Sequence, residues 1–110
     1  MTSFVFSIAA ENDLIEIYRY GTLNYGQEQA ELYVHGIKDK CQLVADTPEL
    51  CRERKEFKPP VRIYNYKSHL IIYILKEKFI LVVRILHARM DLVSEPGWAT
   101  HDLSIHKPEK

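Results

Sequence analysis

The segment from Arg84 to Asp91 concentrates the side chains that are best suited to bind or transfer charge. It holds two arginines and one histidine within six residues. Arginine forks bind phosphate or carboxylate groups through paired hydrogen bonds, so one interpretation is a binding surface for such a group. The other interpretation is local: Arg84 pairs with an acidic helix residue, while Arg89 and Asp91 cap the turn that ends a strand. Composition alone favours the local interpretation, since structural ion pairs also produce such clusters.

The other residues with chemical potential have weaker patterns. His69 opens an apolar run, where a histidine is more often a structural hydrogen-bonding group than a catalyst. Cys41 is interpreted as a small buried apolar side chain. Trp98 is a lone tryptophan outside any core pattern, so it either anchors a contact or packs back on its own domain. The sequence has no metal-binding spacing, glycine-rich phosphate loop or GxSxG motif, and we expect no metal and no cofactor.

The composition indicates one globular domain. The chain has 110 residues, of which 46% are hydrophobic, and this suffices for a core. Its formal net charge of +0 argues against a protein that coats nucleic acid by charge alone, so we expect no sequence-specific binding of nucleic acid by the chain alone. The N-terminus lacks the positive charge of a signal peptide, and no apolar run approaches the roughly 20 residues of a membrane span. The two cysteines form neither a disulfide framework nor a CxxC pair, and we expect a cytoplasmic protein.

Two amphipathic helices are predicted in the first half of the chain. A short strand from Phe4 to Phe6 precedes Ser7, whose hydroxyl suits a helix N-cap. The first helix ends at the break Asn24-Tyr25-Gly26, and the second is weakened in its middle by Gly36. Because the break is short, the helices should form an antiparallel hairpin. The apolar stripes are Ala10, Leu14, Ile17, Tyr18 and Gly21 on the first helix, then Ala30, Tyr33, Val34, Ile37, Cys41, Val44 and Ala45 on the second.

Strand patterns dominate the second half. Thr47-Pro48-Glu49 predicts a short helical turn, and the charge run 52–58 predicts a solvated loop. Strands follow at 61–64, 69–75 and 79–86, the last two joined as a hairpin by a short polar turn. The order is therefore β-α-α-β-β-β, an α+β fold with the helical hairpin packed on one face of a small antiparallel sheet. We expect one domain over residues 1–92 and a flexible C-terminal tail over 93–110.

The last two predicted strands are apolar at almost every position. Two helices can cover only one face of the sheet, and the uncovered face of an antiparallel sheet normally carries polar side chains. Here the second face is too apolar to be left bare. We therefore expect something to cover it: a partner chain in the first place, or else self-association or the C-terminal tail.

Two segments of the second half resemble the C-terminal signature of ParE toxins. Residues His69–Tyr73 are similar to the family pattern H-L-I-x-Y, and Val83–Asp91 to V-R-I/V-L-H-x-R-M-D. The first half is similar to the family's first helix at Ser7–Ala10, Asp13-Leu14 and Ile17-Tyr18, and to its W/Y-G-x-x-Q-A-x-x-Y hinge at Tyr25-Gly26, Gln29-Ala30 and Tyr33. The resemblance runs from about Phe4 to Asp91. The C-terminal signature is fairly specific, whereas the helical motifs alone are weak.

The resemblance implies the toxin of a type II toxin–antitoxin system with a RelE/ParE-like fold. It also implies a ParD-like antitoxin whose disordered C-terminal part wraps the toxin, and DNA gyrase as the target. The related RelE branch instead cuts messenger RNA in the ribosome, which needs basic residues and an acid near the C-terminus. Arg89 falls where one RelE arginine lies, but Glu95 stands in place of a RelE tyrosine, and Leu70 or His69 in place of another arginine. This incomplete set favours a gyrase inhibitor without catalytic residues.

Two sets of contact residues follow from the resemblance and the apolar pattern. The expected target-binding residues are Arg84, Arg89, Met90, Asp91 and Trp98. The expected antitoxin-binding residues are Leu14, Tyr18, Tyr33, Ile72, Ile74 and Val83. If the chain is a ribosome-dependent endoribonuclease instead, Arg89 and His87, together with His101, would form a different acid–base set. A member that has lost toxicity and only binds its partner is the third possibility.

Overall fold

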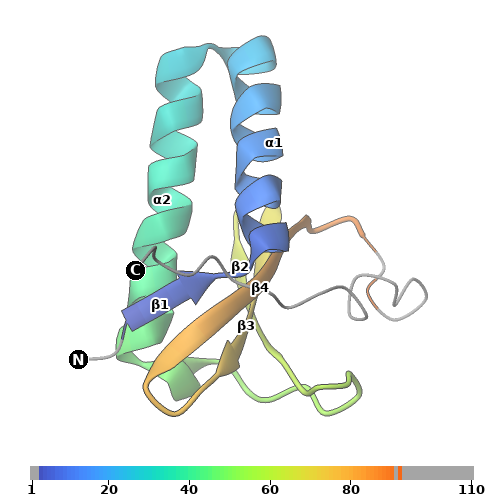
Figure 1. Ribbon diagram of the computed structural model, residues 1–110. Helices are drawn as coiled ribbons and strands as arrows, with labels where there is room; N and C mark the ends of the chain where they lie inside the picture. The colour runs from blue at the N-terminus through green and yellow to red at the C-terminus, as the bar shows by residue number, and fades with distance from the viewer. Residues whose placement is uncertain (1–2, 91, 93–110) are drawn as a thin grey trace.

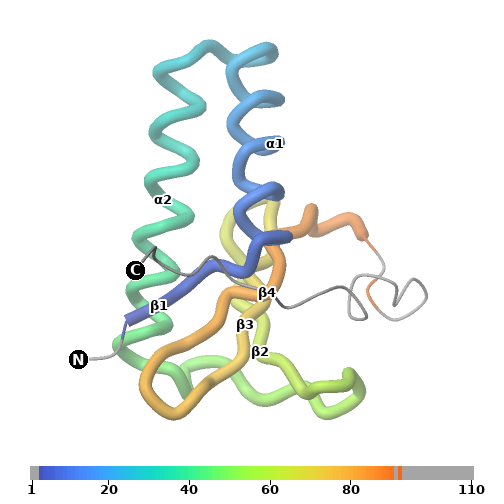
Figure 2. Tube along the Cα trace, viewed as in Figure 1, coloured from blue at the N-terminus to red at the C-terminus, as the bar shows by residue number. Residues whose placement is uncertain are grey.

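The computed structural model describes residues 3–90 and 92, and within them the predicted order of elements is confirmed (Figure 1). The elements are β1 (Ser3–Phe6), α1 (Ile8–Tyr25), α2 (Gln27–Asp46), the 3₁₀ turn η1 (Pro48–Leu50), β2 (Arg62–Tyr66), β3 (His69–Leu75) and β4 (Phe79–His87). The two helices stand side by side as a long hairpin that rises well above the sheet (Figures 1 and 2). The short turn predicted at Thr47-Pro48-Glu49 is η1.

The sheet is mixed, which differs from the antiparallel sheet predicted. Its strand order is β1-β4-β3-β2. Strands β2, β3 and β4 pair antiparallel as expected, but β1 runs parallel to β4, with Phe4 opposite Ile80. No short turn joins β1 to β4, since both helices and two strands intervene, so hairpin geometry does not fix the direction of β1.

A β-bulge interrupts the pairing of β3 with β4. Tyr73 lies opposite Val82 and Ile72 lies opposite Arg84, so Val83 is an extra residue in β4. A bulge bends its strand and leaves the extra residue without a ladder partner. The carbonyl of Val83 is instead bound by a side chain from the start of α1.

Ser7 is that side chain, and it caps α1 as predicted. Its Oγ accepts a hydrogen bond from the Ala10 amide at 3.0 Å and donates to the Val83 carbonyl at 2.7 Å. Ser7 is fully buried. One hydroxyl therefore satisfies both the first turn of a helix and the bulged strand beneath it.

The link between the two helices is shorter than the predicted three-residue break Asn24-Tyr25-Gly26. Helix α1 continues through Asn24 and Tyr25, and Gly26 alone separates the two, at a φ of 95°. Glycine adopts this left-handed backbone without a steric penalty. In α2, a Cβ atom added to Gly36 would lie 2.0 Å from the Tyr66 hydroxyl, so the glycine lets Tyr66 of β2 lie against the helix.

The core has two parts, one on each face of the sheet. The part between helices and sheet includes Leu14, Ile37 and Tyr73. On the other face, Ile72 and Val83 pack with Phe57 from the loop before β2 and with Leu92. The charged side chains of that loop are mostly exposed, as predicted for 52–58, but Phe57 is only 5% exposed. The loop itself thus supplies a cover that the sequence did not indicate.

No helix in the described part of the chain is long and apolar enough to cross a membrane.

Removing the Ser7 hydroxyl should destabilise the whole domain. Ser7→Ala removes the helix cap and leaves the buried Val83 carbonyl unpaired, so we expect a loss of about 2–3 kcal/mol in the free energy of unfolding, measured by urea denaturation. Ser3→Ala, at the exposed start of β1, is the control and should change it by less than about 0.5 kcal/mol. Equal effects of the two substitutions would contradict the double role of Ser7.

Candidate functional site

Arg84 is bound inside the protein by Asp13 of α1. The Arg84 Nε atom lies 2.8 Å from Asp13 Oδ2, and Nη2 lies 3.0 Å from Oδ1. The Ile85 amide also donates to Oδ2, at 2.9 Å. The two charged side chains are only 16% and 15% exposed. This is the ion pair with an acidic helix residue that the local interpretation predicts, and it occupies the edge of the Arg84 guanidinium formed by Nε and Nη2.

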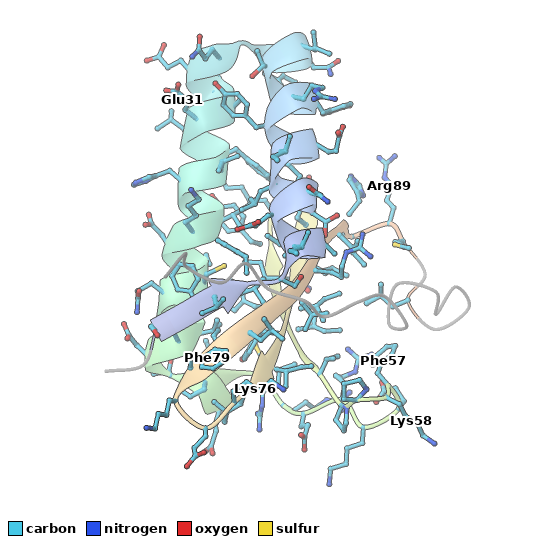
Figure 3. All side chains as sticks on the ribbon, in the orientation of Figure 1. Glu31, Phe57, Lys58, Lys76, Phe79 and Arg89 are labelled. Atoms are coloured by element: carbon cyan, nitrogen blue, oxygen red, sulfur yellow. The ribbon has the colours of Figure 1, made fainter. Side chains whose placement is uncertain are left out.

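Arg89 is exposed to solvent on the turn that follows β4. Its amide donates to His87 Nδ1 at 3.1 Å, and the Met90 amide donates to the His87 carbonyl at 3.0 Å. The Arg89 side chain is exposed, whereas Met90 packs partly against the core of the second face. Figure 3 shows Arg89 at the opposite end of β4 from Phe79. Asp91 and Trp98, the other expected target-binding residues, lie outside the described residues, as do Glu95 and His101.

Tyr33 and His69 form a polar cluster with His87 beneath the helices. The Tyr33 hydroxyl and His69 Nδ1 are 2.7 Å apart, and the Ser68 amide donates to the same hydroxyl. The rings of His69 and His87 stack edge to face with centroids 5.3 Å apart. Burial, aided by the charge of His87 and opposed by that of Asp13, lowers the pKa of His69. Burial likewise raises the pKa of Tyr33, so both groups are held neutral.

His69 therefore has the structural hydrogen-bonding role that its pattern predicts. The residue lies at the start of β3 and is half-buried. The part of the chain between residues 3 and 92 that the structure describes contains no group of three side chains able to hold a metal ion.

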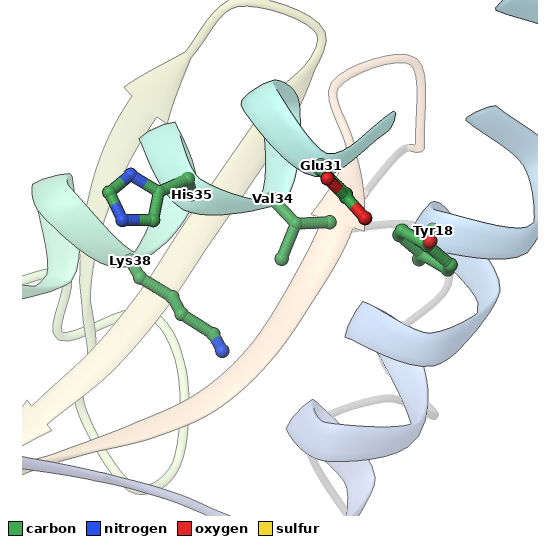
Figure 4. Close-up of a pocket in the computed structure, with 5 residues that line it drawn as sticks. All are labelled: Tyr18, Glu31, Val34, His35 and Lys38. Carbon is green, nitrogen blue, oxygen red and sulfur yellow. The ribbon is translucent and has the colours of Figure 1, made fainter. Parts of the chain in front are cut away.

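A shallow groove runs between the two helices. It encloses about 240 Å³ and is lined by Tyr18 of α1 and by Glu31, Val34, His35 and Lys38 of α2 (Figure 4). Tyr18 and Val34 form its apolar floor, and the three charged or titratable side chains form its rim. Such a combination suits the side chains of an amphipathic peptide segment.

The remaining expected antitoxin-binding residues are distributed over three places. Leu14 is buried in the core under the helices, and Tyr33 belongs to the histidine cluster. Ile72 and Val83 are buried on the second face of the sheet, where Ile74 is half-exposed. Of the six, Tyr18 alone lines the groove. The residues of the groove's rim were not singled out from the sequence, although Glu31 and Lys38 flank the apolar stripe of α2. The predicted helical hairpin brings α1 beside α2, but the spacing that leaves a groove between them has no signal in the sequence.

The fold is that of a known class of small toxin structures. A solved structure described as the chromosomal ParDE TA system from P. aeruginosa superposes with a TM-score of 0.69 at 24% identity, covering 79% of this chain and 96% of that chain. A protein-family model described as the ParE toxin of type II toxin-antitoxin system, parDE, matches residues 4–92. The chain belongs to the ParE toxin family and is the toxin component of a type II toxin–antitoxin system.

Curated relatives agree with this assignment. Toxin ParE1 of Mycobacterium tuberculosis is 33% identical over 90 residues, which are 81% of this chain and 92% of the relative. Toxin ParE3 of Caulobacter vibrioides is 27% identical over 80% of this chain and 88% of its own length. Toxin ParE of Escherichia coli is 28% identical over 86% of this chain and 92% of its own length.

Breaking the Asp13–Arg84 pair should cost far more than breaking an exposed pair. Asp13→Ala leaves a largely buried guanidinium and the Ile85 amide without an acceptor, so we expect a loss of about 3 kcal/mol in unfolding free energy. Glu16→Ala breaks the exposed Glu16–Arg19 pair of the same helix and should cost at most about 0.5 kcal/mol. Chemical denaturation of both variants measures the difference, and a similar small loss in both would show that Arg84 is free for another role.

Proposed function

We propose that this protein inhibits DNA gyrase by binding it in the cytoplasm and is neutralised by a ParD-like antitoxin. The observation that carries the proposal is the match of the ParE toxin family model to residues 4–92, which includes the whole fold and the turn after β4. Gyrase poisoning and an antitoxin partner are what membership of this family implies.

The geometry of the described residues supports binding rather than catalysis. A nuclease that acts on a 2′-hydroxyl needs a free base, a free acid and cations near the phosphate. Arg84 is committed to Asp13, and His69 is half-buried and bonded to Tyr33. His87 has one ring nitrogen engaged by the Arg89 amide. The exposed Arg89 guanidinium can bind a partner but cannot exchange a proton at neutral pH.

The target-binding surface that we propose centres on the turn after β4. Arg89 is exposed there, and Met90 lies next to it, partly packed on the sheet. Arginine and methionine are both enriched in the cores of interfaces. Asp91 and Trp98 remain part of this proposal on the sequence alone. Arg84 contributes indirectly, because its two hydrogen bonds to Asp13 fix the end of β4 from which the turn starts.

For the antitoxin we propose the groove between the helices. Tyr18 and Val34 offer an apolar floor of limited size, and Glu31 and Lys38 offer charges of both signs. A segment that folds on binding can place apolar side chains on the floor and pair its own charges with the rim. The half-exposed Ile74 of the second face remains a further proposed contact.

Arg89 should be required for toxicity but not for folding. Arg89→Ala removes an exposed guanidinium that has no ion-pair partner among the described residues, so unfolding should change by less than about 0.5 kcal/mol. Loss of a central interface arginine costs about 1–2 kcal/mol or more, and we expect the concentration for half-inhibition of gyrase supercoiling to rise about tenfold or more. Arg52→Ala, on the exposed loop before β2, is the matched control and should inhibit like the parent chain.

Unimpaired supercoiling at excess toxin would overturn the gyrase proposal. In that case primer extension on translated messages distinguishes the endoribonuclease: cuts at the ribosomal A site that depend on Arg89 and His87 would establish it.

Antitoxin binding should depend on the tyrosine that faces the groove. Tyr18→Ala removes half of the apolar floor, and the affinity for the purified antitoxin, measured by calorimetry, should fall about tenfold or more. Tyr20→Ala is the matched control, because Tyr20 is 63% exposed and does not line the groove. A larger loss from Tyr20→Ala than from Tyr18→Ala would place the antitoxin elsewhere.

A further inference from the structure

Two histidines face each other where β3 begins and β4 ends. His69 lies directly opposite His87 in the antiparallel ladder, and their ring centroids are 5.3 Å apart. The Ala88 amide still donates to the Ser68 carbonyl, at 2.8 Å, so the two strands remain joined one residue further on. Residues 69 and 87 are thus a pair without mutual backbone hydrogen bonds, the type in which side chains come closest.

The hydrogen bond to His87 fixes its protonation state. Nδ1 of His87 accepts the Arg89 amide proton at 3.1 Å. An imidazole nitrogen accepts only through a free lone pair, so Nδ1 carries no proton and the ring is the neutral form with its proton on Nε2. Protonation of Nδ1 would place two N–H groups against each other and remove this bond.

The surroundings of His69 also favour a neutral ring. The Ser68 amide donates to the oxygen of the Tyr33 hydroxyl at 3.3 Å, so the hydroxyl proton is available to His69 Nδ1, 2.7 Å away. Burial lowers the pKa of His69 and so favours its neutral form. A positive charge on either ring would also repel one on the other at this separation.

The surrounding charges do not compensate for a proton. On α1, Asp13 faces the pair, but its carboxylate is already bound by Arg84 and by a backbone amide. On α2 and β2 the neighbours are tyrosines, Tyr33 and Tyr66. Lys67, in the turn between β2 and β3, lies over the Tyr66 ring and adds positive charge. The lowered pKa of His69 agrees with these surroundings.

We propose that the His69–His87 pair is an acid-sensitive latch on the turn that carries Arg89 and Met90. A proton on His87 breaks the bond to the Arg89 amide, and the turn separates from the end of β4. The sign follows from the geometry of the closed turn: Nδ1 of His87 accepts the Arg89 amide proton only when it carries no proton itself, so protonation favours the opened turn and acid destabilises the closed one. This inference concerns the conformation of the chain and does not depend on the identity of the target.

Hydrogen exchange at the Arg89 amide tests the latch in the full-length protein. The matched variant is His87→Asn, because an asparagine side-chain oxygen accepts the amide two residues on, in an Asx turn, and does not titrate. The ratio of the Arg89 exchange rate in the parent to that in His87→Asn cancels the intrinsic pH dependence of exchange. Because a proton on Nδ1 of His87 removes the bond to the Arg89 amide, we expect this ratio to rise several-fold between pH 7.5 and pH 5.

Two results would overturn the proposal. One is a ratio that stays constant over this range, which would mean that the turn does not open on protonation. The other is a nitrogen NMR spectrum in which His87 carries its proton on Nδ1 at pH 7.5, since the hydrogen bond on which the latch depends would then be absent. The Ile85 amide, which is bound by Asp13, is the internal reference and should exchange alike in both proteins.

Discussion

The free edge of β4 is the constraint on which the rest of the structure depends. β1 pairs with β4 only as far as Val82, and beyond it the bulged residue Val83 and the amide of Ile85 lie buried. A buried backbone group without a partner costs about 1–3 kcal/mol. Ser7, the N-cap of α1, and Asp13 of α1 supply the partners. Helix α1 therefore continues, along the same strand β4, the hydrogen bonding that β1 begins. The position of the helical hairpin on the sheet follows from this.

The same contacts place both surfaces to which we assign binding. Asp13 holds Arg84 and thereby the last residues of β4, and the exposed turn of Arg89 starts directly after them. Once α1 is fixed on β4, α2 is fixed beside it by the single-residue link at Gly26, and the groove at Tyr18 is the space left between the two helices. The core therefore determines where the partners can bind, although it contributes no side chain to the exposed part of either surface.

The sequence predicted the elements well because their signals are local. The cap at Ser7 and the helical turn after Thr47 depend on neighbouring residues only, and both were found. The direction of β1 was not found, because parallel pairing with β4 joins residues more than seventy positions apart. Phe57 was hidden in a charge run, and its burial depends on how the loop folds back over the sheet. The partner of Arg84 was predicted as a class of residue, an acidic helix residue, and only the fold identifies it as Asp13.

Most of the arginines in the described part of the chain are engaged within the protein. Arg19, Arg54 and Arg84 are each in an ion pair, and Arg62 donates to the Cys51 carbonyl. A chain of zero net charge has no strong long-range field to draw it to nucleic acid, so its affinity for a partner comes from short-range fit and from individual exposed charges. Arg89 is such a charge, and it sits on a turn whose shape is set by a hydrogen bond to a neutral histidine. In the target-binding surface that we propose, the end of the sheet would present this one guanidinium in a defined direction, because the hydrogen bonds of His87 hold the four-residue turn on which it lies.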